Sequence, residues 1–369
     1  RFLPERTETG FTDMEKKRII WIELLRVAAC VAVIMLHAGS QHFRDIPIDT
    51  FTWKVSNFYH GFTRFAVPCF IMISGALYLD KKRTWSLKKL WEKNILPVAA
   101  AYVFWQLFYG VYRIMITGSA PVGSARFLKK LLVYFSDAYF HLWYLPMLIG
   151  LMILTPLIWE IVNSPRGKQW EGYMILLFLV FKIAVYTITI FPLPWMEHIK
   201  VLLNTVQPTL VTDFAGYFVL GHYLYEYGLP GKAERAVYIL GPVMILLGIA
   251  LCQWRSLKLD QPVQAFYDNY TLAAFCWSSA VFLFFKNVLG KIRWSERQEK
   301  TICYLGSCTF GIYLIHAFFR DVLHRLGIDS MMMQNTVIAV PLTVLAIFAL
   351  SLAAVSVMKH IPVVKKWII

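Results

Sequence analysis

Long apolar segments alternate with short, polar and often basic segments along almost the whole chain. A transmembrane helix needs about 20 consecutive, mostly apolar residues, and the pattern predicts ten such helices with boundaries good to a few residues. The sixth and ninth are short for a span, and we expect them to tilt against their neighbours or to end early. An all-α integral membrane protein is therefore predicted. Its spans fall at residues 19–39, 62–79, 94–116, 140–162, 172–191, 213–228, 236–254, 270–289, 302–319 and 335–358.

The spans form one domain, because the sequence has no internal repeat and no linker long enough to divide it. We predict a single membrane domain over residues 14–369. Residues 1–13 are polar and lack the apolar core of a signal peptide. We expect them to be an added remnant or a disordered tail, with Met14 as the natural start.

The basic residues in the loops predict the orientation. With the N-terminus in the cytoplasm, Lys and Arg favour the cytoplasmic loops by about two to one, as the positive-inside rule requires. Both termini are therefore predicted to be cytoplasmic. The loop that holds Arg126, Lys129 and Lys130 is the main exception, and we expect it to form an amphipathic helix at the membrane surface.

Composition excludes a soluble domain, since 58% of the residues are hydrophobic and only 16% are charged. A net charge of +15 would suggest nucleic acid in a soluble protein. Here the basic residues lie between apolar spans, which favours anionic membrane lipids as partners and no nucleic acid. The six cysteines form no CxxC pair and no Cys/His zinc motif, so we expect buried free thiols and no metal.

The first predicted span contains three ionisable residues, Glu23, Arg26 and His37. Such groups are costly in hydrocarbon unless they face a protein interior or a wet cavity. Arg26 and His37 are eleven residues apart, which places them on nearly the same helix face, about 16 Å apart along the axis. Glu23 precedes Arg26 by one turn and is close enough to neutralise it. One helix is thus predicted to turn an ion pair and an imidazole inward.

The topology predicts that His37, His141 and His316, from three different spans, share one depth near the outer side. A neutral imidazole there can act as a general base near physiological pH. For His141 and His316 an ordinary hydrogen-bonding role at a helix end remains an alternative. For His37 a functional role is favoured, because a lipid anchor does not need it.

Three further histidines are assigned ordinary roles. His222 lies in the sixth span, nearer the middle of the membrane, and is predicted to be a core or cavity residue. His42 and His60 lie in the first outer loop, where a solvated surface position is the default.

The segment TWSLKKLWEKNILP carries Lys88, Lys89 and Lys93 just before the third span, which Pro97 interrupts near its start. Ordinary positive-inside charge explains most clusters of this kind. A more specific hypothesis is a cytoplasmic binding patch for a phosphate-bearing cofactor, because lysine acts as a point charge toward phosphate. Arg26 would then lie between this patch and His37.

Four segments resemble the ordered signature segments of the acyltransferase-3 family of integral membrane O-acyltransferases, and the similarity extends over residues 17–358. The most specific element is an arginine, ten intervening residues and a histidine in the first span, here Arg26 and His37. The segments are RIIWIELLRVAACVAVIMLHA, FTRFAVPCFIMISGALYL, HLWYLPMLIGLMILTPLI and LGSCTFGIYLIHAFF.

The resemblance implies ten spans, cytoplasmic termini, and a location in the cell inner membrane. It also implies acetyl-CoA, or another acyl-CoA, as cytoplasmic donor, and a hydroxyl of a glycan or lipid-linked saccharide as outer acceptor. His37 would be the catalytic base and Arg26 its partner in the donor channel. His141 and His316 match two further family histidines, and Arg64 matches a family position that we group with the cofactor-binding residues.

Two positions depart from the family pattern. Glu23 stands where the family usually has aspartate, and the paired arginines before the third span are replaced, with Leu90 and Lys93 at the closest positions. At the second departure, a lysine and a leucine stand where the resemblance implies arginines that contact the donor's phosphates.

The proposed chemistry has His37 deprotonating the acceptor hydroxyl for attack on the thioester, either directly or through an acyl-His37 intermediate. The main alternative is a proton-coupled transporter or permease of a glycan or lipid-linked sugar, since ionisable groups near the midplane of a helical bundle suit a carrier as well. A carrier predicts interrupted helices at matching positions in two halves, and the sequence shows no such symmetry. A membrane receptor or scaffold with a lipid pocket is a further alternative, for which nothing in the sequence is diagnostic.

Overall fold

A computed structural model describes residues 18–83, 85–191, 201 and 213–369. Within these ranges the protein is built from helices and turns and contains no strand, which confirms the predicted fold class. The predicted tail at 1–13, together with Met14, lies outside the described residues.

Nine of the described helices are long and apolar enough to cross a membrane. Several consist of helical pieces that follow one another without a break. The nine are α1 (Ile20–Gly39), α2–α3 (Phe51–Tyr78), α4–α5 (Leu87–Thr117), α7 (Tyr144–Val162), α8–α9 (Gly167–Thr189), α13 (Gly231–Leu259), α14 with its flanking 3₁₀ turns (Ala265–Lys291), α15 (Glu296–Arg325) and α16 (Thr336–Met358).

The sixth predicted span is a short helix, α12 (Phe214–Glu226), of 13 residues. Ten of these residues are buried, so α12 is enclosed by its neighbours rather than facing lipid along its length. The expectation that this segment falls short of a full span is confirmed. The ninth segment was expected to be short as well, and that prediction was wrong. α15 has 30 residues and begins earlier than predicted, because Ser295 and Gln298 form a capping box at its start.

The second span also begins earlier than predicted. α2 (Phe51–Phe62) leads through the 3₁₀ turn η1 (Thr63–Phe65) into α3 (Ala66–Tyr78). The side chain of Thr50 caps the helix by accepting a hydrogen bond from the Trp53 amide at 3.2 Å. His60 is therefore buried in a helix, with an exposed fraction of 3%, and the prediction of a solvated loop position was wrong.

A π-helical turn, η2 (Trp91–Ile95), joins α4 (Leu87–Leu90) to α5 (Leu96–Thr117). Pro97 has no backbone N–H to donate to the carbonyl four residues earlier, which accounts for the irregular ladder at this point. A second π turn, η3 (Leu179–Ala184), lies between α8 (Gly167–Phe178) and α9 (Val185–Thr189).

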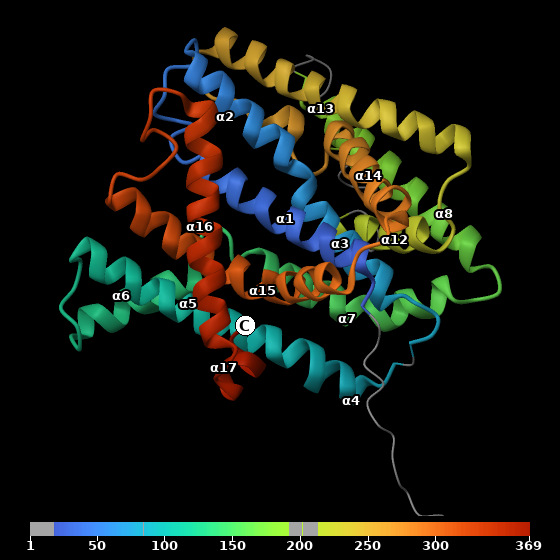
Figure 1. The fold of residues 1–369 in the computed structure, drawn as a ribbon, viewed down its shortest axis with the longest axis horizontal. Coiled ribbons are helices and arrows are strands. Elements are labelled where there is room, and N and C mark those ends of the chain that lie inside the picture. Colours follow the sequence, from blue (N-terminus) through green and yellow to red (C-terminus); the bar gives the residue numbers. More distant parts are fainter. Residues whose placement is uncertain (1–17, 84, 192–200, 202–212) are drawn as a thin grey trace, which may run out of the picture.

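The loop after α5 contains the predicted surface helix, α6 (Ala125–Ser136), which pairs with α5 at the edge of the bundle (Figure 1). Ser124 caps it, and none of its residues is buried. Leu128 and Leu132 are exposed along with Arg126 and Lys129 of the same helix, as expected of an amphipathic helix at a membrane surface.

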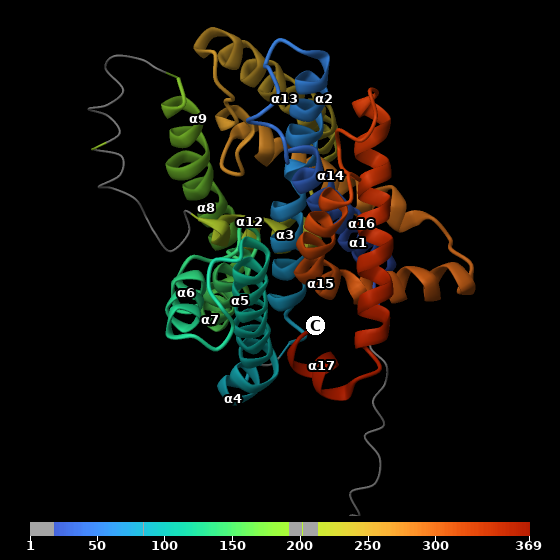
Figure 2. The ribbon, with the colours of Figure 1, turned by 90° about the vertical axis from the view of Figure 1, so that its left-hand side faces the viewer.

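α1 lies at the centre of the bundle and packs against α2, α3, α14 (Leu272–Asn287), α15 and α16 (Figures 1 and 2). α3 and α12 are also in close contact. A Cβ added to Gly75 would lie 1.8 Å from the Phe218 carbonyl oxygen, and one added to Gly221 would lie 2.1 Å from that of Met72. Glycine at these positions lets the two backbones meet directly.

The two ends of the bundle differ in their side chains. Arg18, next to α1, and Lys359, next to α16, line one cavity, so these two parts of the chain lie at the same end. We call this the basic end. We call the opposite end, where His37, His141 and His316 lie, the histidine end. The short helix α17 (Pro362–Trp367) follows α16 at the basic end and contacts α5.

Buried polar residues and thiols follow the sequence predictions in part. His222 on α12 is a core residue, as predicted, and its Nδ1 lies 2.9 Å from Oε2 of the fully buried Glu171 on α8. All six cysteines are free, as expected. Four of them are buried, and Cys276 and Cys303 are half-buried.

Candidate active site

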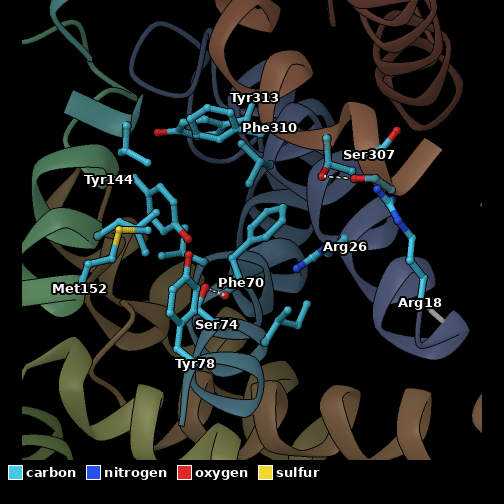
Figure 3. Close-up of a pocket in the computed structure, with 17 residues that line it drawn as sticks. Arg18, Arg26, Phe70, Ser74, Tyr78, Tyr144, Met152, Ser307, Phe310 and Tyr313 are labelled. Carbon is cyan, nitrogen blue, oxygen red and sulfur yellow. Dashed lines mark hydrogen bonds between the residues drawn. The ribbon is translucent and has the colours of Figure 1, made fainter. Parts of the chain in front are cut away.

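The inward face of α1 borders two cavities, one near each end of the helix. The larger, of about 380 Å³, is lined by Arg18, Arg26, Tyr78 and Tyr144 among others, and we call it the arginine cavity (Figure 3). The smaller, of about 120 Å³, is lined by His37, Arg64, His141 and Trp143 among others, and we call it the histidine cavity. The predicted inward orientation of Arg26 and His37 is what the structure shows.

Glu23 holds the basic groups of the arginine cavity in place. Its Oε1 lies 3.1 Å from Nη1 of Arg26, and its Oε2 lies 3.8 Å from Nη1 of Arg18. Arg18 also donates a hydrogen bond to the Cys303 carbonyl at 2.9 Å. Gly306 on α15 allows this arrangement, because a Cβ there would lie 2.1 Å from Glu23 Oε2. The predicted Glu23–Arg26 ion pair is thus present, and Arg26 extends into the space bordered by Phe70, Ser74 and Tyr78 (Figure 3).

The three predicted histidines meet at the histidine end. His37 stacks on His316 with ring centroids 5.4 Å apart, and His141 meets His316 edge-on at 5.0 Å. α1 contributes His37, the turn before α7 contributes His141, and α15 contributes His316. Their common depth, predicted from the alternating direction of the spans, is confirmed.

Hydrogen bonds to carbonyl groups fix which ring nitrogens carry protons. His316 Nδ1 lies 2.6 Å from the Tyr313 carbonyl, and His141 Nε2 lies 3.3 Å from the Leu314 carbonyl. Because a carbonyl only accepts, both nitrogens must be protonated donors. His316 Nε2 and His141 Nδ1 are then buried acceptors without a hydrogen-bond partner in the described part of the chain. A buried polar atom without a partner costs free energy. His141 lines the histidine cavity, so its Nδ1 suits a ligand there that donates a hydrogen bond, whereas His316 lies behind the cavity lining, against the rings of His37 and His141.

The sequence did not single out the charged group beside these histidines. Arg320, one turn after His316 on α15, forms an ion pair with Asp321 at 2.6 Å, and Tyr139 donates a hydrogen bond to the same carboxylate. The Arg320 guanidinium also lies 4.4 Å from the centre of the Phe140 ring, which contacts His37 at 4.8 Å. The four-residue spacing from His316 to Arg320 was the available signal, because residues four apart share a helix face.

Four side chains line both cavities and form the wall between them: Val33, Val67, Tyr144 and Tyr313. They come from α1, α3, α7 and α15. Tyr313 also donates a hydrogen bond to the His141 carbonyl, which ties this wall to the histidine cluster. The arginine and histidine cavities thus lie back to back, with one layer of side chains between them.

Arg64 lines the histidine cavity rather than the arginine cavity. Its Nη2 lies 2.8 Å from His60 Nε2, and the Tyr267 hydroxyl lies 3.3 Å from the other nitrogen of that ring. The Tyr267 hydroxyl in turn lies 3.0 Å from Asn57 Oδ1. This buried network positions Arg64 beside His37. A contact between Arg64 and the cofactor stays a prediction.

The three lysines predicted to contact phosphate are exposed on α4 and η2, and none of them lines the arginine cavity. Their role stays a prediction. A different basic group borders a third cavity, of about 510 Å³, at the basic end, which we call the basic cavity and which shares Arg18 and Ser307 with the arginine cavity. Its lining includes Lys359 and Lys365, and Lys359 Nζ lies 2.5 Å from Ser307 Oγ. The sequence did not indicate this group because Arg18 is more than 300 residues from Lys359 and Lys365.

Comparison with known proteins gives one match. The family model described as an acyltransferase domain matches residues 19–356, a range that contains every lining residue of the histidine cavity and all but Arg18 of the arginine cavity. Searches of curated proteins and of solved structures found no significant match. The family match covers nearly the whole chain and agrees with the resemblance of its signature segments. The protein therefore belongs to the acyltransferase-3 family of membrane acyltransferases.

Proposed function

We propose that the protein transfers an acyl group, by default acetyl, from cytoplasmic acyl-CoA to a hydroxyl of a glycan or lipid-linked saccharide on the outer side of the cell inner membrane. The observation that carries this proposal is the pair of back-to-back cavities, one with arginines near the basic end and one with histidines near the opposite end. The donor and the acceptor can then approach the same wall from opposite sides.

The basic end suits the donor's phosphates. Arg18 lines both the basic cavity and the arginine cavity, and Lys359 lines the basic cavity and contacts Ser307, which lines both. Cations at this position attract phosphate oxygens. Beyond them the arginine cavity is mostly apolar, with polar atoms from Ser74, Tyr78 and Arg26. A thin arm with amide groups and a thioester fits such a lining, while the charged nucleotide stays in water.

The chemistry takes place at His37. A neutral His37 removes the proton of the acceptor hydroxyl, the oxygen attacks the thioester carbonyl, and the carbon–sulfur bond breaks to release coenzyme A thiolate, which then takes up a proton. The free nitrogen of His141 can accept a hydrogen bond from an acceptor hydroxyl, Arg64 can orient the same group, and His316 supports His37 by stacking on its ring. Direct transfer and passage through an acyl-His37 intermediate give the same overall reaction.

The wall of Val33, Val67, Tyr144 and Tyr313 must part to let the thioester reach His37. While closed, it separates the donor from water and from acceptor, which suppresses hydrolysis. A variant that fills the wall should therefore block acyl transfer but leave acyl-CoA binding at the basic end unchanged.

The test measures acyl-CoA binding and acyl transfer on the same purified protein. Because a ligand that binds only the native state stabilises it by about 2.7 kcal/mol at 100 times its Kd, acetyl-CoA should raise the melting temperature. Val67→Trp should keep this shift and lose transfer, because it fills the wall and leaves the basic end intact. Val67→Ala is the control and should keep both. If acyl-CoA produces no shift in the wild type, the donor assignment is wrong and the transporter alternative gains support.

A further inference from the structure

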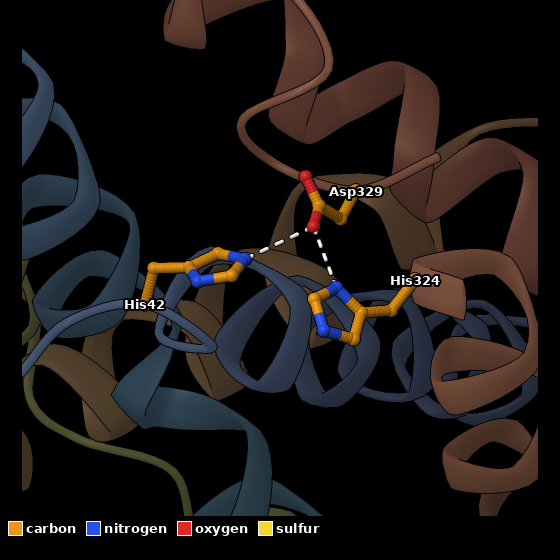
Figure 4. Close-up of side chains that lie close together, drawn as sticks. All are labelled: His42, His324 and Asp329. Atoms are coloured by element: carbon orange, nitrogen blue, oxygen red, sulfur yellow. Dashed lines mark hydrogen bonds and ion pairs between the residues drawn. The ribbon is translucent and has the colours of Figure 1, made fainter. Parts of the chain in front are cut away.

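Two histidines and one aspartate meet at the histidine end, outside the cavities described above (Figure 4). His42 lies in the turn after α1, His324 in the last turn of α15, and Asp329 in the loop that leads to α16. Asp329 Oδ2 lies 3.0 Å from His42 Nε2 and 2.7 Å from His324 Nδ1. Each residue offers one ligand atom that lies within 4.8 Å of those of the other two. His42 was predicted to be a solvated surface residue, but only 21% of its side chain is exposed.

The local backbone holds the carboxylate in this position. α15 ends at Arg325, and Gly327 reverses the chain with a φ of 76°, a conformation that glycine adopts at little cost. Asp329 Oδ1 then accepts a hydrogen bond from the Met331 amide at 2.7 Å, which leaves Oδ2 directed at the two imidazoles. His42 has a second carboxylate behind it, since its Nδ1 lies 3.9 Å from Asp45 Oδ2.

The geometry matches the ligand set of a transition-metal ion. Zn²⁺ takes imidazole nitrogens and carboxylate oxygens at about 2.0 to 2.2 Å, so tetrahedral ligand atoms stand about 3.3 Å apart. Two of the three spacings are within about 0.6 Å of that value. The Met331 amide orients the aspartate, as outer partners of metal ligands commonly do.

The carboxylate is held by donors on both of its oxygens, since the two imidazoles lie against Oδ2 and the Met331 amide donates to Oδ1. An aspartate oxygen is among the ligands that Zn²⁺ takes in proteins. The exposed side of His324 leaves room for a water molecule as fourth ligand.

We propose that His42 Nε2, His324 Nδ1 and Asp329 Oδ2 bind one divalent transition-metal ion, for which Zn²⁺ is the best fit. The ion would join the turn after α1 to the end of α15, the two helices that carry His37 and His316. It would thus fix the relative position of these two rings without contacting substrate. The sequence gives no sign of this metal site and no metal was predicted. His42 and Asp329 are 287 residues apart, and neither lies in a metal motif.

The test is metal binding by the full-length purified protein, measured after chelator treatment and removal of the chelator. Elemental analysis after addition of Zn²⁺ and gel filtration should find one zinc per chain, and calorimetry should give the affinity. Asp329→Asn should abolish this binding. Asp49→Asn changes an exposed aspartate of the loop between α1 and α2, and this variant should bind zinc like the wild type.

Two results would overturn the proposal. One is a wild type that retains no zinc, which would leave the group as a hydrogen-bonded cluster only. The other is equal zinc retention by the wild type and Asp329→Asn, which would place the ion elsewhere. If Asp329→Asn fails to fold, the wild type still decides the question, since Zn²⁺ should raise its melting temperature and Mg²⁺, which prefers oxygen ligands, should not.

Discussion

At the scale of single residues, Arg26 and His37 on the inward face of α1 differ in whether they have a polar partner. Arg26 has an anionic partner in Glu23 at 3.1 Å. His37 contacts the rings of His316 and Phe140 but forms no hydrogen bond within the described part of the chain. An imidazole without a partner in a span costs free energy that an apolar residue would not. We interpret this cost as the consequence of keeping a base free for substrate.

Replacing His37 by alanine should reduce acyl transfer by about 10²- to 10⁴-fold, the usual contribution of a positioned general base. The protein level in the membrane and the melting temperature should stay near the wild-type values, because His37 forms no hydrogen bond with any residue that the structure describes. Radiolabelled acyl transfer and an immunoblot of the membrane fraction measure the two quantities. Activity within a few-fold of the wild type would rule out His37 as the base.

The two nitrogens of His316 can be tested separately. Its Nδ1 donates to the Tyr313 carbonyl, whereas Nε2 is buried without a partner in the described residues. His316→Asn places an amide near the Nδ1 position, so it should fold normally and lose most activity. His316→Gln places an amide near the Nε2 position and should keep more activity than the asparagine variant. Melting temperature and transfer rate are the measurements, and full activity of His316→Asn would show that Nε2 is not used.

At the scale of helices, regular periodicity and alternating direction were enough for much of the site. The eleven-residue spacing predicted the shared face of Arg26 and His37. The direction of each span predicted that His141 and His316 would lie at the same depth as His37. The sequence could not show where α2 begins, because its polar residues look like a loop. Asn57 donates to the Ile249 carbonyl at 3.1 Å and contacts Tyr267, so its partners come from distant segments.

Long-range contacts also explain what else the sequence missed. The cluster of Arg320, Asp321 and Tyr139 depends on α15 packing beside the turn that precedes α7. Arg18 and Lys359 come together only because the described chain begins and ends its path through the bundle at the same side. Residue spacing predicts a shared helix face but not the pairing of distant helices.

The contact between α3 and α12 gives a prediction about folding. Gly221→Ala should lower the yield of monodisperse protein and its melting temperature, because the added Cβ would lie 2.1 Å from a backbone oxygen that cannot rotate away. Overpacking of this kind costs about 1 to 3 kcal/mol or more. Gly172→Ala is the matched control, since a Cβ on that helical glycine meets nothing within 4 Å. Equal stability of the two variants would mean that α3 and α12 are farther apart than described.

At the scale of the whole molecule, the bundle has two chemically different ends, and the proposed reaction requires them to face different compartments. The basic end carries Arg18, Lys359 and Lys365, in keeping with the positive-inside rule. The histidine end carries α6, the amphipathic helix whose basic residues are the exception to that rule. Its position at the bundle edge explains the exception, because a surface helix can hold cations at the headgroups.

The orientation can be measured by cysteine labelling in intact cells. Arg126→Cys on α6 and Lys366→Cys on α17 both introduce exposed thiols, whereas the six native cysteines are buried or half-buried. A membrane-impermeant maleimide should label Arg126→Cys in intact cells, and Lys366→Cys only after permeabilisation. The wild type reports background labelling. The reverse pattern would place the basic end outside and exclude a cytoplasmic donor.

The account rests on the claim that an acyl group passes from the basic end to the histidine end across the wall between the two cavities. Membrane vesicles of known sidedness, carrying the cell's own envelope glycans, test it when radiolabelled acetyl-CoA is added to the outside only. Inverted vesicles, which expose the cytoplasmic face, should accumulate ester-linked label in glycans of the lumen, and right-side-out vesicles should not. The same inverted vesicles with His37→Ala or Val67→Trp should remain unlabelled. Label that appears only in right-side-out vesicles, or persists in both variants, would contradict the account.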